Sequence, residues 1–343
     1  MSRIVAFGLD NYSVGEFPGM GDFGWQIAGN NSTTGGGSAT VAISNDVAAN
    51  PWLQFGIMAL VQPAKLRPWA GVLDTPWVAS SPVAMTLYNV EYLASLRVPI
   101  APGVLTGTVF DISGQLIAMA NAQEEMYLRL GLTAGDASTR SLVMDQTPIW
   151  AQLTKFCAAA GLEVVTRPAI EGNRLIIYVD ILARVGVDTN FLAHEGQGNA
   201  VANMKVLKAT VDGQIVNSLQ GIGSQSTQGS RLATSFLQAS DSIAKYRLRS
   251  AVQQINVPDQ ATLDASTPVY LSWASTPKLK LQVAIIDVGD AFLAADLGNT
   301  AIFHAANVQL PGGKRGWKGM ARILAMVYKE SNRTVEMTVE AAL

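Results

Sequence analysis

The sequence predicts a mainly β protein with an α/β insert, and three observations indicate this fold class. Residues 1–98 contain short apolar runs separated by Gly, Pro, Asn and Ser clusters, which is typical of a small barrel or sandwich. From about Gly107 the apolar residues take helical spacing, and strand-like runs resume after residue 190. The length of 343 residues also allows several cores. We therefore expect a first β domain over 1–104, an α/β insert domain over 105–190 and a second β domain over 191–343 with a small helical insert near 256–280.

Turn residues divide the first β region into strand-like runs. The runs are SATVAISND from Ser38, WLQFGIMALV from Trp52, WAGVLDTPWV from Trp69 and PVAMTLYNV from Pro82. Before the first of these runs, Asn30 to Ser38 reads NNSTTGGGS and is expected to be a polar loop. It lacks the Lys-Ser/Thr that follows the glycines of a phosphate-binding loop, so no phosphate site is expected there.

The α/β insert is expected to contain two helices followed by two strands. The helices are expected over 111–123 and 148–160, and the strands over 162–168 and 174–182. Asp111 is the expected N-cap of the first helix. Thr147 is expected to cap the second, with Pro148 at its first position and Gly161 ending it. Glu171-Gly172-Asn173 is expected to turn between the strands.

The second β region is expected to begin with a hairpin. Val206–Val211 and Ile215–Leu219 flank Asp212-Gly213, and glycine accepts the positive φ that a tight hairpin turn requires. A helix is expected to open at SDSIAKYRLRSAV. The later segment DQATLDASTPVYLSWAST is ambiguous, because Pro268 interrupts any long helix but suits the start of a short one, Pro268–Ala274. The chain is expected to close with three strands, KLKLQVAIIDVGDAF, GWKGMARILAMVYKE and RTVEMTVEAAL.

The composition is low in charge for a protein that is expected to be made in the cytoplasm and to stay soluble there. Hydrophobic residues make up 49% and charged residues 15%, against about a quarter charged in typical domains. Because interface centres are depleted in charge, we expect much of the surface to be buried against other subunits. The longest apolar runs, such as Phe55–Val61 and Ile323–Tyr328, are too short for a spanning helix. A net charge of −2 without a basic run argues against a nucleic-acid binder.

Few residues suit catalysis or metal binding, and we expect no catalytic, cofactor-binding or metal site. The two histidines, His194 and His304, each lack a second ligand at a suitable spacing. No GxSxG motif occurs. The single cysteine, Cys157, excludes an internal disulfide and a thiolate metal cage.

Carboxylate pairs are harder to dismiss, because a glycosidase needs only two acids that meet in space. The nearest candidates are Asp287 with Asp290, Glu124 with Glu125, and Glu336 with Glu340. Ordinary turn, helix-end and strand contexts account for each pair.

Aromatic and basic residues suggest contacts rather than chemistry. The tryptophans are dispersed and are interpreted as core and interface anchors, although stacking platforms for sugars or bases stay open; they are Trp25, Trp52, Trp69, Trp77, Trp150, Trp273 and Trp317. Gly312–Gly319 reads GGKRGWKG and places three cations in a Gly-rich loop. Contact with an acidic partner and a solvated loop are equal alternatives for it.

Several short motifs stand in a characteristic order along the chain: Trp69-Ala70-Gly71, Asp212 to Gly221 with Ile215-Val216-Asn217, Asp241-Ser242-Ile243 with Tyr246, Gly289-Asp290, Arg322-Ile323 and Glu336. In these motifs and in the order of its elements, the chain resembles the baseplate hub or tail-hub proteins of tailed bacteriophages and related contractile injection systems. Arg247 departs from the pattern, since many relatives carry Gly after the tyrosine.

The resemblance implies a homotrimer in which each chain contributes two tube-like β-barrel domains that flank or surround the α/β domain. Six barrels would form a pseudo-hexameric ring around a DNA-passage channel and join a six-fold tail tube to a three-fold tip. The implied partners are a tail tube or distal tail protein, a tape-measure protein, and tip or fibre proteins. The implied location is the virion tail tip or baseplate, after assembly in the host cytoplasm. A tail-associated cell-wall hydrolase and a glycan-binding module are the alternatives.

Overall fold

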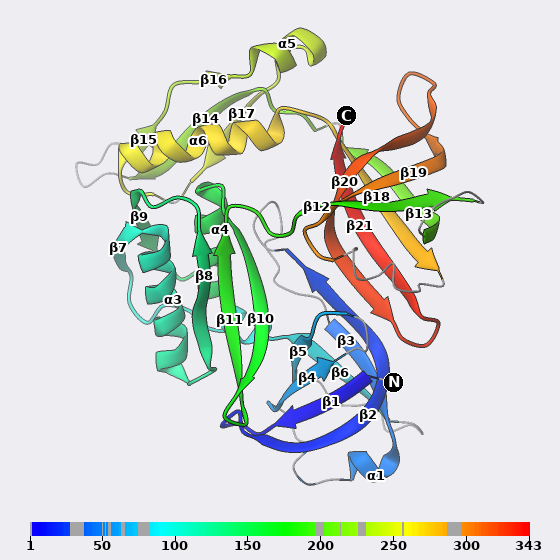
Figure 1. Ribbon diagram of the computed structural model, residues 1–343. Helices are drawn as coiled ribbons and strands as arrows, with labels where there is room; N and C mark the ends of the chain where they lie inside the picture. The colour runs from blue at the N-terminus through cyan, green and yellow to red at the C-terminus, as the bar shows by residue number, and fades with distance from the viewer. Residues whose placement is uncertain are drawn as a thin grey trace.

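The computed structural model describes residues 2–27, 38–49, 51, 53, 56–62, 66–74, 83–196, 202–212, 214–225, 231–255, 257–286 and 296–343 (Figure 1). Strands dominate it, and a 12-stranded sheet runs β1-β4-β5-β6-β3-β2-β20-β19-β12-β13-β18-β21. The expected fold class, mainly β with an α/β insert, is confirmed. None of the helices in these residues is long and apolar enough to cross a membrane.

The long sheet closes on itself twice and so forms two six-stranded barrels. Pairing of β1 with β2 closes the first barrel, and pairing of β20 with β21 closes the second. The first barrel contains β1 (Ser2–Phe7), β2 (Ser13–Gln26), β3 (Ser38–Ile43), β4 (Met58–Gln62), β5 (Trp69–Leu73) and β6 (Val83–Asn89). The second contains β12 (Asp188–Glu195), β13 (Ala202–Asp212), β18 (Lys278–Ile286), β19 (Thr300–Gln309), β20 (Arg315–Lys329) and β21 (Thr334–Ala342).

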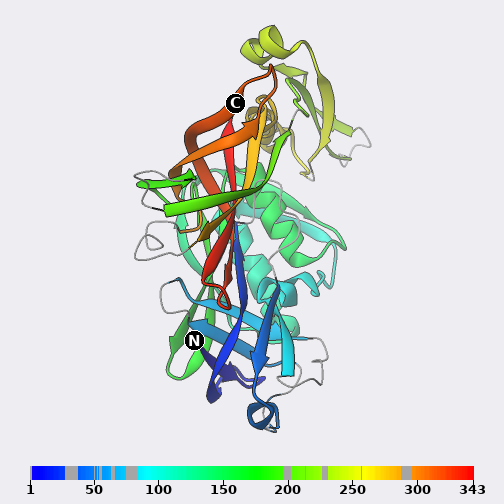
Figure 2. The ribbon, with the colours of Figure 1, turned by 90° about the vertical axis from the view of Figure 1, so that its right-hand side faces the viewer.

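Antiparallel pairing of β2 with β20 joins the two barrels, from Asp22 opposite Lys329 to Gln26 opposite Ala325. Figures 1 and 2 show one barrel above the other with this joint between them. Alternate residues fill each interior, as period-2 geometry requires. On β21, for example, Val335, Met337 and Val339 are buried and their neighbours are half-buried.

The α/β unit, residues 103–182, packs against the outside of the first barrel. It contains β7 (Gly103–Thr108), α3 (Val109–Gln123), β8 (Leu128–Ala134), β9 (Thr139–Met144), α4 (Ile149–Ala159), β10 (Glu163–Glu171) and β11 (Arg174–Leu182). Phe7, Met58 and Leu60 of the first barrel belong to the same hydrophobic cluster as Leu153 and Phe156 of α4. The expected apolar face of α4 is therefore buried, and this core is shared with the barrel. Two short helices, α1 (Asn45–Ala48) and α2 (Glu91–Ser95), lie within the first β region.

The expected turn between β10 and β11 is confirmed, whereas both helix caps were predicted wrongly. Gly172 and Asn173 have φ of 55° and 65° between the paired strands. Thr108, not Asp111, is the N-cap of α3: its Oγ1 accepts the Asp111 N–H at 3.1 Å, while Asp111 Oδ2 accepts the Thr108 N–H at 3.0 Å. This reciprocal pair satisfies two donors, so the helix begins earlier.

At the start of α4, Pro148 is the N-cap and the helix begins at Ile149. Thr147 makes no capping hydrogen bond; its own N–H donates to Asp145 Oδ1 at 2.7 Å. Asp145 thus forms an Asx turn with the Thr147 N–H just before the helix begins.

The predicted hairpin around Asp212-Gly213 is wrong. β13 pairs with β18 from Asn203 to Asp212 and with β12 only from Ala202 to Met204, and β14 pairs with β15, β16 and β17 rather than with β13. The chain instead enters a separate four-stranded sheet. Gly213 lies outside the described residues, and Asp212 Oδ1 accepts the Gln214 N–H at 3.0 Å.

That separate sheet belongs to the small unit, residues 218–274. It contains β14 (Ser218–Gln225), β15 (Arg231–Ala233), β16 (Leu237–Gln238), α5 (Ser240–Tyr246), β17 (Ser250–Gln254) and α6 (Gln260–Ala274). Helix α6 packs closely on β14 at Gly221, where a Cβ atom would come within 2.1 Å of Thr267 Oγ1. Only glycine fits this approach.

Helix α6 continues through Pro268, which contradicts the expectation that this proline interrupts a long helix. Asp259 Oδ1 caps the helix by accepting the Thr262 N–H at 2.8 Å. Proline removes the hydrogen bond to the Asp264 carbonyl, but Asp264 and Pro268 are both exposed, so water can reach that carbonyl. Burial of Leu263 and Leu271 on the other face keeps the helix intact.

A buried ion pair ties the α/β unit to the second barrel. Arg322 of β20 contacts both carboxylate oxygens of Glu163 at the start of β10, with Nη2 to Oε2 at 2.6 Å. Arg322 also donates to the Val185 carbonyl at 2.6 Å and the Gly298 carbonyl at 3.0 Å, and Glu163 accepts the Val185 N–H at 2.7 Å. The Glu163 side chain is 5% exposed, so neither charge is easily solvated when the other is absent.

Glu163→Gln is expected to lower the free energy of unfolding by about 3–5 kcal/mol, because it leaves the Arg322 charge without its counter-ion. Urea unfolding followed by circular dichroism measures the loss. The control is Arg3→Gln in the exposed pair Arg3–Glu16, where we expect almost no change. Equal effects in the two variants would contradict the assignment.

The turn after α5 places a side chain in a conformation that favours glycine. Arg247 has φ 64° and ψ 163°, a region occupied almost only by glycine. Buried Asn217 fixes this turn: its Nδ2 donates to the Arg247 carbonyl at 2.8 Å, and its Oδ1 accepts the Arg249 N–H at 2.7 Å. The turn is therefore kept although arginine stands at the position.

Arg247→Gly is expected to raise the free energy of unfolding by about 1 kcal/mol, because it relieves this backbone strain. Arg231→Gly, in the strand β15 and without positive φ, is the matched control and should give no gain. A loss of stability in Arg247→Gly, measured by denaturant unfolding, would refute the argument.

Candidate functional site

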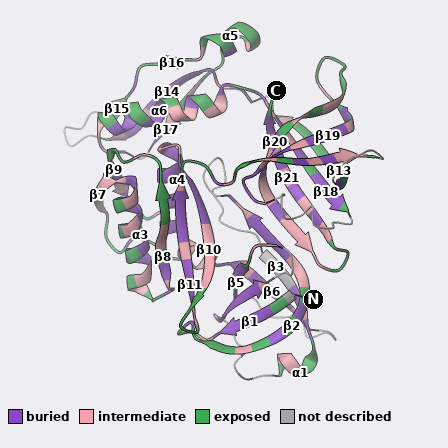
Figure 3. Ribbon diagram, viewed as in Figure 1, coloured by how far each residue is buried: buried purple, intermediate pink, exposed green. Residues whose placement is uncertain are grey.

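The outer faces of the two barrels are covered unequally. In the first barrel β4 and β5 are almost entirely buried, because the α/β unit covers their outer side. In the second barrel β13 is largely exposed on its outer side (Figure 3). Leu207, Ile286 and Met320 lie on the outside of the second barrel with 46%, 46% and 53% exposure. The uncovered outer faces therefore carry exposed apolar side chains as well as polar ones such as Lys205 and Lys208.

The two histidines lie together, although the sequence suggested that each was isolated. β12 is paired with β19 so that His194 stands opposite His304, and the ring centroids are 4.2 Å apart in a T-shaped arrangement. Within the described ranges, no group of three or more His, Cys, Asp and Glu residues could hold a metal ion. The strand pairing joins positions far apart in the chain, so residue spacing could not reveal this contact.

The candidate carboxylates that the structure describes are all engaged by cations. Asp287 and Asp290 lie outside the described residues. The remaining pairs are Glu336 with Lys329 (2.5 Å), Glu340 with Lys278 (3.1 Å) and Lys280 (3.6 Å), Glu125 with Arg129 (3.0 Å), and Glu124 with Arg97. Glu336 and Glu340 share one face of β21, as expected. Their geometry is that of strand-surface ion pairs.

Cys157 is unsuited to nucleophilic chemistry. Its side chain is fully buried on α4, and this burial raises the pKa of the thiol to about 12. A neutral thiol is a weak nucleophile and a poor metal ligand. The residue therefore acts as a small apolar side chain in the shared core.

The tryptophans divide between core and surface. Trp25, Trp69 and Trp150 are buried, in agreement with core anchoring, and Trp52 and Trp77 lie outside the described residues. Trp317 packs partly against the barrel core. Trp273 is half-buried and contacts Tyr270, with ring centroids 5.6 Å apart.

The expected Gly-rich loop at Gly312–Gly319 is only partly a loop. Gly312 and Gly313 form the tip of the β19–β20 hairpin with φ of 80° and 77°, and β20 begins at Arg315. Lys314 and Lys318 are exposed, and Arg315 donates to Asn307 Oδ1 at 3.0 Å. Contact with an acidic partner and plain solvation both remain open.

Glu91 is a buried carboxyl between the first barrel and β10. Thr166 donates to its Oε1 at 2.5 Å, whereas Oε2 is buried without a hydrogen-bond partner among the described residues. Burial raises the pKa of this carboxyl, and the Thr166 hydrogen bond opposes that shift only in part. The site holds a proton more tightly than an exposed glutamate.

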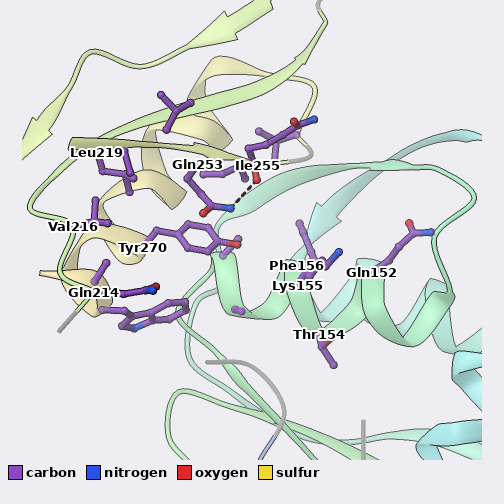
Figure 4. A pocket seen from close by; sticks show the side chains of 18 of the residues that line it. Gln152, Thr154, Lys155, Phe156, Gln214, Val216, Leu219, Gln253, Ile255 and Tyr270 are labelled. Carbon is purple, nitrogen blue, oxygen red and sulfur yellow. Dashed lines mark hydrogen bonds between the residues drawn. The ribbon is translucent and has the colours of Figure 1, made fainter. Parts of the chain in front are cut away.

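A cleft of about 680 Å³ lies between α4 of the α/β unit and the small unit (Figure 4). Lys155 and Phe156 lie on one side, and Gln253, Ile255 and Tyr270 lie on the other. Burial raises the pKa of the Tyr270 hydroxyl, so it stays protonated. Near this cleft Arg140 Nη1 donates to Ser266 Oγ at 3.2 Å, linking β9 to α6. The walls come from segments about one hundred residues apart, and no local pattern in the sequence indicated them.

No protein-family model matches the chain, and no curated protein matches its sequence. Solved structures do share its fold over nearly the full length. The prophage tail protein gp18 from Listeria monocytogenes EGD-e is 13% identical, with 99% of this chain and 94% of that chain covered and a TM-score of 0.58. A tail protein from Neisseria meningitidis MC58 is 11% identical, with 99% and 96% covered and a TM-score of 0.59.

The tail protein of prophage MuSo2 from Shewanella oneidensis is also similar, at 11% identity, with 98% of each chain covered and a TM-score of 0.58. The chain therefore has the fold of phage tail proteins, and the resemblance noted in the sequence is confirmed at the level of the fold. Sequence identity this low leaves function to be argued from the molecule itself.

The raised pKa of Glu91 makes stability depend on pH. Between the unfolded pKa, about 4.3, and the higher folded pKa, the folded state keeps a proton that the unfolded state loses, so stability falls as pH rises. Glu91→Gln should remove this loss. Between about pH 4, near the glutamate pKa, and about pH 7, the free energy of unfolding should therefore fall less in the variant than in the wild type. Urea unfolding across that range measures it, with the exposed Glu125→Gln as control. A wild-type profile that stays parallel to that of Glu91→Gln would contradict the raised pKa.

Proposed function

We propose that this chain is a structural protein of a phage tail, acting as the hub of the tail tip or baseplate. The observation that carries the proposal is the pair of closed six-stranded barrels joined edge to edge by β2 and β20. This arrangement is part of the fold shared with the three prophage and tail proteins. On this proposal the chain joins a six-fold tail tube or distal ring to a three-fold tip.

A homotrimer with two barrels per chain supplies six barrels, and closed cyclic symmetry leaves no barrel without neighbours. The six barrels would surround a channel for DNA passage. The low share of charged residues, 15%, fits a chain whose outer barrel faces become interfaces.

The covered faces restrict how the barrels would meet. The α/β unit already occupies the outside of β4 and β5, so it would lie at the periphery of the ring. Neighbouring barrels would use the remaining faces, which carry Leu207 and Ile286 on the adjacent strands β13 and β18, and Met320 on β20. We propose the division 1–104, 105–190 and 191–343 for the first barrel, the α/β unit and the second barrel with the small unit.

The proposed role is non-enzymatic, with a location in the virion tail after assembly in the host cytoplasm. The ion-paired carboxylates and the neutral Cys157 thiol support it. The proposed partners are a tail tube or distal tail protein above, a tape-measure protein within, and tip or fibre proteins below.

The purified chain is expected to form a trimer of 36.3 kDa subunits, because the uncovered barrel faces bury apolar surface on assembly. Light scattering and native mass spectrometry measure the mass, and electron microscopy should show six lobes. Met320→Glu should favour the monomer, since it replaces an exposed apolar side chain of β20 by a charge that would be buried in the proposed ring.

Leu132→Glu is the matched control, because Leu132 is exposed on the α/β unit outside the proposed contacts. A strict monomer, even after mixing with tail-tube and tip proteins, would contradict the hub role. Release of muropeptides from host cell walls by the purified chain would contradict the non-enzymatic role.

A further inference from the structure

Strand β17 has an edge that no other described strand pairs. It runs parallel to β14, with Ser250 opposite Ser218 and Gln254 opposite Ile222. The Ile255 N–H donates to the Ile222 carbonyl at 2.8 Å, and the Arg249 carbonyl accepts from β14. In a parallel ladder each residue directs its N–H and its C=O to the same side of the strand, and successive residues alternate between the two sides. Val252 and Gln254 therefore direct theirs away from β14.

This free edge faces the cleft. Ala251 to Ile255 all line it, whereas a cleft lying on one face of a strand would touch only alternate residues. The edge also lacks the devices that protect exposed strands, since SAVQQ contains no charge and no proline. Val252 is 55% exposed. The strand is thus open to pairing along its length.

The opposite wall of the cleft carries a cationic and an aromatic side chain. Figure 4 shows Lys155 and Phe156 of α4 across the cleft from Gln253 and Ile255. Lys155 is exposed and forms no ion pair with any acid among the described residues. Gln253 Nε2 donates to the Gln254 carbonyl at 3.0 Å, which leaves the N–H groups of Val252 and Gln254 and the Val252 carbonyl to be paired. Tyr270 closes one side with an aromatic surface.

We propose that this cleft binds an extended segment of a partner polypeptide, which adds a strand to β17 and places an acidic side chain opposite Lys155. Main-chain hydrogen bonds would supply affinity, and the cleft walls would select side chains. The five residues of β17 span roughly 17 Å at about 3.3 Å per residue, the length of a short strand.

A peptide backbone fits this edge better than a glycan does. Its N–H and C=O groups repeat at the strand spacing of Val252 and Gln254, and sugar hydroxyls have no such repeat. The inference rests on the cleft and on the free edge, and it stands whether or not the chain is a tail hub.

The test begins with a displayed library of random twelve-residue peptides, selected on the full-length chain. Enriched peptides should contain an acidic residue within an apolar, β-prone stretch. Synthetic fluorescein-labelled copies are then titrated by fluorescence anisotropy. Hydrogen exchange should show new protection of the Val252 and Gln254 amides, while the amides of Ala251 and Gln253, already paired with β14, change little.

Val252→Pro is the decisive variant. Proline removes the outward N–H yet leaves the β14 ladder intact, since the Val252 N–H makes no bond to β14. Binding should weaken about tenfold, as for one lost hydrogen bond, whereas the control Val252→Thr should bind like wild type. Lys155→Glu should weaken acidic peptides most. Circular dichroism checks that each variant is folded.

A second test uses the wild-type chain and peptides whose backbone amides expected to face β17 are N-methylated. These peptides cannot donate the strand hydrogen bonds, so they should lose binding. The proposal is overturned if no peptide is enriched, or if Val252→Pro and the methylated peptides bind as before. It is also overturned if a glycan array binds the chain, Trp273→Ala abolishes that binding, and no peptide competes.

Discussion

Backbone hydrogen bonds between β2 and β20 join two closed barrels, and the position of every other element depends on this joint. A sheet edge left open would expose unpaired N–H and C=O groups, so closure within each barrel satisfies the backbone. β2 and β20 are long enough to contribute both to closure and to the joint. The two barrels are therefore parts of one continuous hydrogen-bonded sheet rather than separate bodies.

The α/β unit reinforces that arrangement from outside. It covers one side of the first barrel through a shared core, and the Glu163–Arg322 pair attaches it to the second barrel. The ion pair is costly to desolvate, and its three further hydrogen bonds with the backbone offset that cost. The α/β unit thereby covers one side of the first barrel, and we propose that uncovered barrel faces contact other proteins.

The same placement creates the cleft. α4 is held by the core of the α/β unit, and β17 is held by its pairing with β14 in the small unit. The strand addition that we propose would therefore use an edge that is already in strand conformation, which lowers the conformational entropy lost on binding.

Local patterns in the sequence determined the fold class, the buried face of α4 and the turn at Gly172-Asn173, because these depend on period, apolar spacing and positive φ within a few residues. They also pointed to the tail-protein fold. Only the tertiary structure decided that β13 and β14 separate, that α6 continues through Pro268, that His194 meets His304, and that Lys155 faces β17. Each of these depends on which distant strand occupies an edge or which face is buried. Such pairings are set by the competition for hydrogen bonds and apolar area across the whole chain, which no short stretch of sequence records.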